Sequence, residues 1–278
     1  MLPFFYTIYL KGSCFKVFYK SYLLFFFLSS SGTHMLFSKI EKGKPVKLVI
    51  QGDVRGSSKG TYWPASTIKL LPAIAVMRSG INPRTYVRMK RYRGTVRTLL
   101  KRALSVSSNV AYDSLVDLVG QDYVNATAKH LGLKHTWISR PYGRRGTFYY
   151  SAPYRLGKKY IRAKRAKLKN PKCKSNCTSL EDLQKMILYT SKDKELRRWT
   201  QRHGKFAKVF KKYFPKAKVY CKSGYVAHHH GLTNCRFGNY IITIATPCGS
   251  WKNWHKNKKL RMRMAESVMS TYIKGRVP

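Results

Sequence analysis

Three short motifs, spread over more than half of the chain, constrain its fold more than any other feature. They read Ser66-Thr67-Ile68-Lys69, Ser107-Ser108-Asn109 and Lys222-Ser223-Gly224. Each motif is weak alone, because a serine and a lysine three residues apart occur by chance in a chain with 56 Lys and Arg. The flanking sequence predicts that the first two begin helices and that the third lies in a strand. The fold must therefore place two helix N-termini beside one strand if the motifs act together.

The first motif has the pattern of an activated nucleophile. Ser66 follows Trp63-Pro64-Ala65 and precedes an apolar run that ends at Met77, which predicts a helix with Ser66 and Lys69 on one face of its first turn. A hydroxyl at a helix N-terminus beside an amine that can accept its proton is suited to nucleophilic catalysis. The alternative is that Ser66 only caps the helix and that Lys69 is solvated.

The motif set resembles that of the serine β-lactamase and penicillin-binding protein (D-alanyl-D-alanine peptidase) superfamily, in its class A β-lactamase-like form. The resemblance covers about residues 45–275. It implies an α+β fold, in which an antiparallel sheet built from the N- and C-terminal parts of the chain is flanked by helices and carries an inserted helical lobe. The interval between Ser66 and Ser107 is short for this family, which a trimmed lobe would explain.

The resemblance also implies a role for each motif residue. Ser66 would be the acylated nucleophile, Lys69 its proton acceptor and Ser107 a proton relay, while Asn109, Lys222, Ser223 and Gly224 would bind substrate. The backbone N–H groups of Ser66 and Tyr225 would form the oxyanion hole. Ser223 stands where Thr is commoner, Gly224 would let substrate approach the backbone, and neither metal nor cofactor is implied. The alternative for the second motif is an ordinary N-cap made by Ser107 or Ser108.

Lys69 can act as a base near neutrality only if its pKa lies well below its usual value. A free lysine titrates near 10.4, so a depression of roughly 3 units is needed. Repulsion from Lys222, at the distance of about 5 Å that the resemblance implies, would supply part of it.

Hydrophobic periodicity predicts further elements along the chain. A strand is expected at 44–52, helices at 95–101, 109–119 and 123–131, and another helix after the capping residues Thr178 and Ser179. Strands at 217–227, 232–237 and 239–247 and a helix at 259–273 complete the pattern. Residues 140–174 contain 13 Lys and Arg and no acid, and are predicted to form an extended loop with at most one short helix.

A carboxylate is missing where class A β-lactamases need one. These enzymes activate the deacylating water with a Glu between the second and third motifs. No Asp or Glu occurs here between Asp122 and Glu181. Glu181 is predicted to cap its helix, and Asp182, Asp193 and Glu195 are predicted to lie at the surface. We therefore expect that Ser66 is acylated and that the acyl-enzyme has one of three fates. It is hydrolysed with the help of Lys69 or Ser107, it transfers its acyl group to an amine, or it persists.

The net charge of +46 is the second unusual feature of the chain. Such a charge attracts polyanions, including acidic cell-wall polymers, nucleic acid and anionic lipid. A compositional bias of the whole lineage is the competing explanation. The first functional hypothesis is a serine hydrolase or acyl-transferase acting on D-alanyl peptides or β-lactam-like amides. The alternative is a catalytically idle member of the fold that binds cell-wall or other polyanions. Nucleic acid is not an expected partner, because no recognised nucleic-acid motif is present.

The first 34 residues resemble a leader. A basic stretch, a short apolar run and Ser29-Ser30-Ser31-Gly32 match a secretory signal, and neither apolar run is long enough to span a bilayer. Residues 35–278 are then the β-lactamase-like domain, and the protein is expected to be exported, with membrane contact only through an uncleaved leader. An uncleaved anchor and translation from Met35 are the alternatives.

The cysteine pattern moderately favours export. Counting outward from the predicted turn at 228–231 places Cys221 opposite Cys235, within reach of a disulfide. Cys173 and Cys177 could close a small loop, Cys248 is left over, and Cys14 would leave with a signal peptide. Free thiols and a zinc site are the alternatives. His228 and His230 could bind a metal together, although such a tract at a turn is more often surface.

Overall fold

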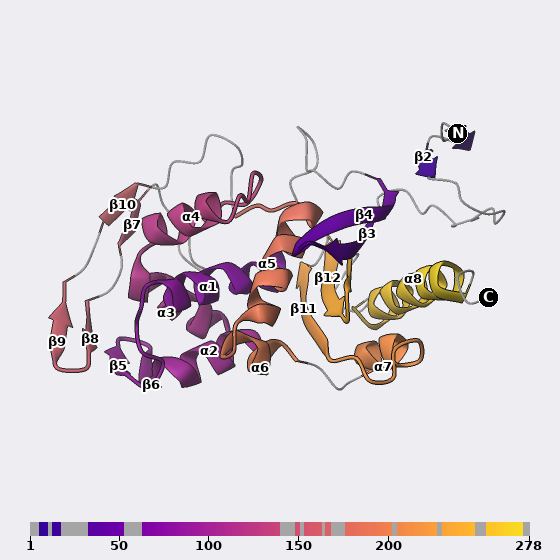
Figure 1. Cartoon of the computed structure of the whole chain (residues 1–278). Coiled ribbons are helices and arrows are strands. Elements are labelled where there is room, and N and C mark those ends of the chain that lie inside the picture. Colours follow the sequence, from indigo (N-terminus) through magenta and orange to yellow (C-terminus); the bar gives the residue numbers. More distant parts are fainter. Residues whose placement is uncertain are drawn as a thin grey trace.

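The computed structural model describes residues 6–10, 13–17, 33–52, 63–139, 148–150, 153–162, 165–167, 176–201, 205–226, 230–247 and 254–274 (Figure 1). Its largest sheet has five antiparallel strands in the order β11-β12-β13-β3-β4. The strands are β3 (His34–Glu41), β4 (Lys44–Gln51), β11 (Val219–Val226), β12 (His230–Phe237) and β13 (Tyr240–Pro247). The predicted sheet, built from both ends of the chain, is confirmed.

Strand β3 is the element of this sheet that sequence analysis does not predict. It lies between β13 and β4, and its residues Met35, Leu36 and Phe37 are all buried. Leu36 belongs to the core on one face of the sheet, while Met35 and Phe37 belong to the core on the other. A strand covered on both faces lacks the polar–apolar alternation that identifies a half-buried strand.

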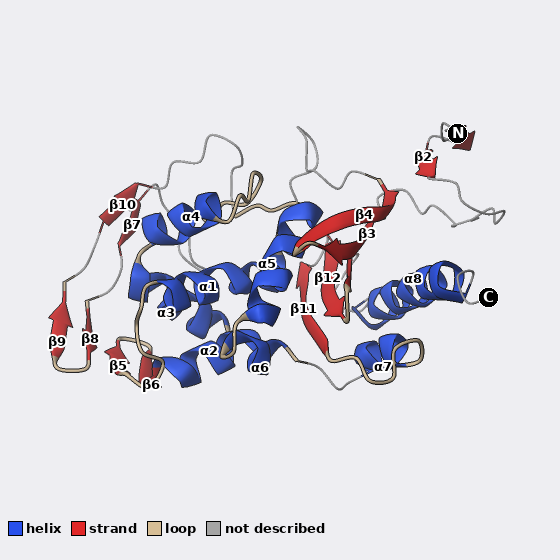
Figure 2. Cartoon of the chain, viewed as in Figure 1, coloured by secondary structure: helices blue, strands red, loops and turns tan. Residues whose placement is uncertain are grey.

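Helices cover both faces of the sheet (Figure 2). One face packs against α7 (Lys205–Lys211) and α8 (Trp254–Lys274), with a core that includes Phe210, Phe237 and Met269. The other face packs against the helical lobe through α5 (Leu180–Lys192), which contacts β12, β13 and α1. Helix α8 is longer than the helix predicted at 259–273, and α7 was not predicted.

The helical lobe is formed by the chain between the N-terminal and C-terminal strands. Besides α5, its elements are the 3₁₀ helix η1 (Ala65–Lys69), α1 (Leu70–Arg78), α2 (Val96–Leu104), α3 (Asn109–Val119), α4 (Gln121–His130) and α6 (Leu196–Thr200). The side chains of Thr95, Ser108 and Ser179 each accept a backbone N–H of the first turn, and the caps at Ser108 and Ser179 are among those considered from the sequence. The predicted helices agree with the observed ones to within a few residues, whereas α6 was missed.

Short strands complete the described structure. A four-stranded antiparallel sheet in the order β6-β5-β8-β9 lies at the end of the helical lobe (Figure 1) and was not predicted. It comprises β5 (Tyr86–Met89), β6 (Tyr92–Thr95), β8 (Tyr154–Leu156) and β9 (Lys159–Ile161). Two further pairs are β7 (Phe148–Tyr150) with β10 (Arg165–Lys167) and β1 (Tyr6–Leu10) with β2 (Ser13–Val17). The described parts of residues 140–174 are thus strands and turns rather than a helix.

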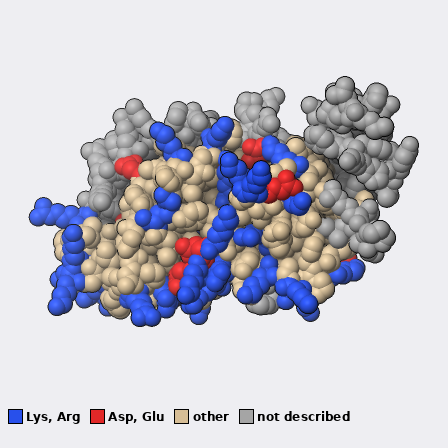
Figure 3. Space-filling view, in the orientation of Figure 1, with Lys and Arg blue, Asp and Glu red and all other residues tan. Residues whose placement is uncertain are grey.

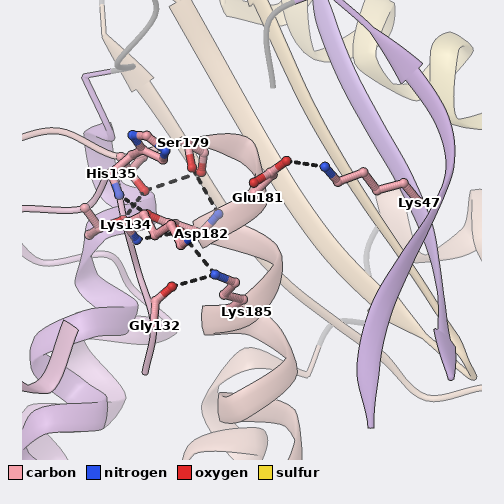
Figure 4. A network of polar contacts seen from close by, with 10 residues as sticks. Lys47, Gly132, Lys134, His135, Ser179, Glu181, Asp182 and Lys185 are labelled. Atoms are coloured by element: carbon pink, nitrogen blue, oxygen red, sulfur yellow. Dashed lines mark hydrogen bonds and ion pairs between the residues drawn. The ribbon is translucent and has the colours of Figure 1, made fainter. Parts of the chain in front are cut away.

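A buried carboxylate joins the loop after α4 to α5, contrary to the predicted surface position of Asp182 (Figure 4). Asp182 is 1% exposed, and it accepts hydrogen bonds from the backbone N–H groups of Lys134 (3.2 Å) and His135 (2.7 Å) and from the Thr136 hydroxyl (3.0 Å). Burial raises the pKa of this carboxyl, while the hydrogen bonds from His135 and Thr136 and the charge of Lys185 act in the opposite direction. Asp182 therefore holds two segments of the lobe together and does not face solvent.

The other acids near α5 have structural partners. Glu181 pairs with Lys47 of β4, so its side chain reaches the sheet and Ser179 alone provides the side-chain cap (Figure 4). Asp193 accepts the backbone N–H groups at the start of α6. Glu195 pairs with Arg97 of α2 at 2.7 Å.

The predicted disulfide between Cys221 and Cys235 is present, and the two residues are direct partners in the register of β11 and β12. Cys177 is also disulfide-bonded, whereas Cys173 and Cys248 lie outside the described residues. Within the described part of the chain, no helix is both long enough and apolar enough to cross a membrane.

Candidate active site

Ser66 lies in the first turn of η1, and η1 leads directly into the buried helix α1. Its neighbours Ala65, Thr67 and Ile68 are buried, whereas Ser66 itself is only partly covered. Ala65 has a φ of 47°, a conformation that a residue with a side chain rarely adopts. Such strain costs of the order of 1–3 kcal/mol and is typical of functional sites. The chain therefore presents the Ser66 hydroxyl on a constrained turn.

The Lys69 amine is the centre of the site. Its Nζ is 2.8 Å from Ser66 Oγ, 2.6 Å from the Ser107 carbonyl oxygen and 2.7 Å from Asn109 Oδ1. The carbonyl and amide oxygens can only accept hydrogen bonds. A neutral Lys69 would donate its two protons to these oxygens, and its lone pair would then face the Ser66 hydroxyl. This arrangement suits transfer of a proton from Ser66 to Lys69, and it excludes the alternative of a solvated Lys69.

Burial lowers the pKa of Lys69 to about 8, while the negative charge of Asp113 acts in the opposite direction. The side chain is fully buried, so the ammonium form loses most of its hydration. The predicted depression is therefore found, but its main cause is burial rather than repulsion from Lys222.

Ser107 lies between the two lysines of the outer motifs. Its Oγ accepts a hydrogen bond from Lys222 Nζ at 2.8 Å and lies 3.4 Å from Lys69 Nζ. Its φ is 62°, so this residue also has a strained backbone. The capping role belongs to its neighbour Ser108, whose Oγ accepts the Ala111 N–H at 3.2 Å. Ser107 is thus free of the cap and is held between the two amines.

Strand β11 brings the third motif to η1. The backbone of Gly224 lies so close to η1 that a Cβ there would be 2.6 Å from the Ser66 nitrogen and 2.7 Å from Ala65 Cβ. The space that a side chain at Gly224 would need is therefore filled by the protein itself, which is a reason for glycine besides the approach of substrate that the resemblance implies. A glycine is needed here so that β11 can pack against the turn that carries Ser66.

Ser223 points toward a buried arginine. Its Oγ is 3.3 Å from Thr233 Oγ1 on β12, which accepts a hydrogen bond from Arg261 Nε at 3.0 Å. Arg261 belongs to α8 and is 1% exposed. Besides Lys69 and Lys222, the site therefore has a third buried basic side chain, Arg261, behind Ser223. No sequence pattern distinguishes Arg261 from the many other basic residues.

Asp113 is the acidic residue whose charge acts on Lys69. It lies one turn after Asn109 on α3, is 4% exposed, and has Arg91 Nη1 3.6 Å from its Oδ2. Asp113 was not among the predicted site residues, which included no acid between the second motif and Asp122. Its spacing of four residues from Asn109 could have identified it, since such residues share a helix face.

Acylation of wild-type protein is expected to rise with pH and to level off above a midpoint near pH 8. The rise follows from the lowered pKa of Lys69, because only the neutral amine accepts the Ser66 proton. Asp113→Asn removes a charge that raises this pKa, so its midpoint should lie at lower pH. The rate constant of acylation measured from pH 6 to 10 tests both expectations. Asp122→Asn, at an exposed acid on α4, is the control; a midpoint near that of a free lysine would contradict the assignment.

Among the described residues, no group of three or more His, Cys, Asp or Glu side chains could hold a metal ion. His228, which the sequence could pair with His230 as metal ligands, lies outside the described residues.

Comparison with known proteins relates this geometry to one family. A sequence profile of the β-lactamase enzyme family matches residues 87–271, which include Ser107 and Lys222. No curated protein sequence matches the chain significantly.

Solved structures share the fold at low identity. A β-lactamase from Sphaerobacter thermophilus is 15% identical, covers 88% of this chain and 92% of its own, and superposes with a TM-score of 0.56. A class A β-lactamase from Mycobacterium abscessus and the chromosome-encoded β-lactamase of Vibrio parahaemolyticus are each 14% identical with TM-scores of 0.60, covering 86% of this chain and 93% of their own. These likenesses show the fold, and the profile match covers more than half of the chain. The chain belongs to the β-lactamase enzyme family.

Proposed function

We propose that the protein is a serine hydrolase or acyl-transferase that forms an acyl-enzyme at Ser66 with D-alanyl peptides or β-lactam-like amides. The observation that supports this most is the position of Lys69 Nζ, which contacts Ser66, Ser107 and Asn109 at once. A general base positioned in this way contributes about 10²–10⁴-fold to a reaction rate.

The proton moves along the contacts of the site. Ser66 Oγ bonds to the carbonyl carbon of the substrate while its proton passes to neutral Lys69. The carbonyl oxygen becomes an oxyanion, which the backbone N–H groups of Ser66 and Tyr225 would stabilise. The C–N bond then breaks, and the leaving nitrogen takes the Ser107 hydroxyl proton, which Lys69 replaces. Lys222 keeps Ser107 oriented for this transfer.

The charges of the site favour an anionic substrate. Lys222 is 3% exposed and contacts Ser107, while Arg261 is fully buried and reaches Ser223 only through the Thr233 hydroxyl. A carboxylate on the substrate would compensate these charges, and D-alanyl peptides and β-lactams both carry one. Because Lys69 donates to the Asn109 amide oxygen, the amide N–H₂ of Asn109 would serve as the donor to a substrate carbonyl.

In this proposal, no Glu activates a water for deacylation as it does in class A β-lactamases. The sequence has no Asp or Glu between Asp122 and Glu181, and Glu181, Asp182 and Glu195 have structural partners. Slow hydrolysis through Lys69 or Ser107, or transfer of the acyl group to an amine, is therefore proposed in place of rapid β-lactam turnover.

Intact-mass measurement after incubation with a penicillin tests the proposal. One penicillin should add to each chain, and digestion should place it on the peptide that contains Ser66. Absence of an adduct would instead favour the second candidate, an idle fold that binds cell-wall polyanions, which the basic surface favours (Figure 3). Export of the protein through residues 1–34 belongs to this proposal, because its substrates lie outside the cytoplasm.

A further inference from the structure

The four-stranded sheet at the end of the helical lobe aligns three arginines and a tyrosine in one row. Arg88 of β5 is opposite Arg93 of β6 on one side and opposite Arg155 of β8 on the other. Arg155 is in turn opposite Tyr160 of β9. Directly opposed residues of antiparallel strands share a face, with Cβ atoms about 4.5–5.5 Å apart.

This face of the sheet is open to solvent. Arg88, Arg93 and Arg155 are exposed, whereas the residues that alternate with them, including Val87 and Tyr154, are buried against the lobe. Tyr86, two residues before Arg88 and thus on the same face, is 54% exposed, and Tyr160 is 59% exposed. We call these five residues the Arg–Tyr face. Basic side chains protrude at this end of the molecule (Figure 3).

The charge of the Arg–Tyr face is not neutralised by the described part of the chain. None of its three arginines forms an ion pair there, and on the same hairpin Arg91 is the residue that pairs with an acid, Asp113. Residues 123–180, which include β8 and β9, contain no acid at all. Like charges directly opposite one another destabilise a sheet, so the row lowers stability until an anion binds.

The chemistry of the row identifies the kind of partner. Arginine presents a planar fork that matches phosphate in a bidentate way, and an exposed tyrosine ring stacks on flat rings such as nucleobases. No large aliphatic side chain is exposed on this face, which argues against insertion into a membrane. We propose that the Arg–Tyr face binds single-stranded nucleic acid, with the arginines on backbone phosphates and the tyrosines stacked on bases.

The proposal differs from the expectation drawn from sequence, in which nucleic acid is not a partner. The five residues form no sequence motif, because they come from four strands and are brought together only by the register. The face is also built from residues other than those around Ser66, so the proposal stands independently of the acyl-enzyme chemistry.

Binding of the full chain to a labelled single-stranded DNA of about 12 nucleotides, followed by fluorescence anisotropy, tests the proposal. The triple variant Arg88→Gln, Arg93→Gln, Arg155→Gln should weaken binding at least about tenfold and reduce the salt-dependence slope by about 2. The matched control, Lys256→Gln, Lys259→Gln, Arg263→Gln, removes the same charge from exposed positions on α8 and should change affinity less than about threefold. Equal weakening by the two triple variants would show that only net charge matters and would overturn the proposal.

The variant Tyr160→Ala distinguishes binding of nucleic acid from binding of other anions. It should weaken binding of the DNA by about fivefold or more, because a stacking surface is lost. The affinity for inorganic polyphosphate, measured by its competition with the DNA, should not change, because polyphosphate has no rings to stack. If Tyr160→Ala has no effect on the DNA, or if only phosphatidylglycerol vesicles bind, the partner is not nucleic acid. Thermal unfolding of the arginine triple variant should be unchanged or shifted upward, because like charges are removed, and penicillin labelling at Ser66 should be unaffected.

Discussion

Ser66→Ala is expected to abolish the penicillin adduct and to lower any hydrolysis of a chromogenic cephalosporin by at least about 10⁴-fold. Without the hydroxyl, no covalent intermediate can form, and the neighbouring Lys69 amine and Ser107 hydroxyl have no nucleophile to serve. Ser66 is only partly covered at the start of η1, so its loss should leave the fold intact. Gel fluorescence after labelling with a fluorescent penicillin and circular dichroism of the same samples measure both quantities.

Ser79→Ala is the matched control for this experiment. Ser79 follows the far end of α1, the helix that continues from η1; its Oγ donates to the Val76 carbonyl at 2.7 Å, away from the site. This variant should label like wild type. Equal labelling of Ser66→Ala and wild type would show that another residue is acylated and would end the assignment.

Gly224→Ala is expected to reduce the rate of acylation by at least about 100-fold. The added Cβ would lie 2.6 Å from the Ser66 nitrogen and 3.0 Å from the Thr67 nitrogen, so either β11 or η1 must move. A displacement of about 1 Å at a reacting group costs about this factor in rate. Overpacking should also lower the free energy of unfolding by roughly 1–3 kcal/mol. Acylation kinetics and thermal unfolding of the purified variant provide the two measurements.

Gly80→Ala is a control that introduces backbone strain without a steric clash, whereas Gly224→Ala introduces a steric clash. Gly80 has a φ of 75°, yet a Cβ there meets no atom within 4 Å, whereas at Gly224 the space is missing. Gly80→Ala should therefore reduce stability by roughly 1–2 kcal/mol and leave the acylation rate unchanged. If both alanine variants lose only stability and acylate at the wild-type rate, the contact between β11 and η1 does not position Ser66.

Much of the fold could be predicted because its elements have regular patterns. Helices α3 and α5 have hydroxyl caps and apolar faces at helical spacing, and the hairpin of β11 and β12 has a register that pairs Cys221 with Cys235. Strand β3 and the small sheet could not be predicted. The first is buried on both faces, and the strands of the second have only three or four residues each.

The candidate site could be predicted in its residue types but not in its electrostatics. Ser66, Lys69, Ser107 and Lys222 lie together as the motif order implies. The pKa of Lys69 depends on how completely the surrounding helices exclude water, which no local pattern shows. The roles of Asp113 and Arg261 depend on packing between elements far apart in the chain.

The sequence by itself determined which chemical groups this protein can use. Hydroxyls and amines at fixed spacings on helix starts and on a strand predict a serine nucleophile, because local spacing decides which side chains share a face. Tertiary structure alone decided three other properties. Packing buries Lys69 and lowers its pKa, the approach of β11 to η1 makes Gly224 necessary, and strand register aligns Arg88 with Arg93 and Arg155. Each of these depends on the distance between segments that are remote in sequence, and such distances exist only once the chain has folded.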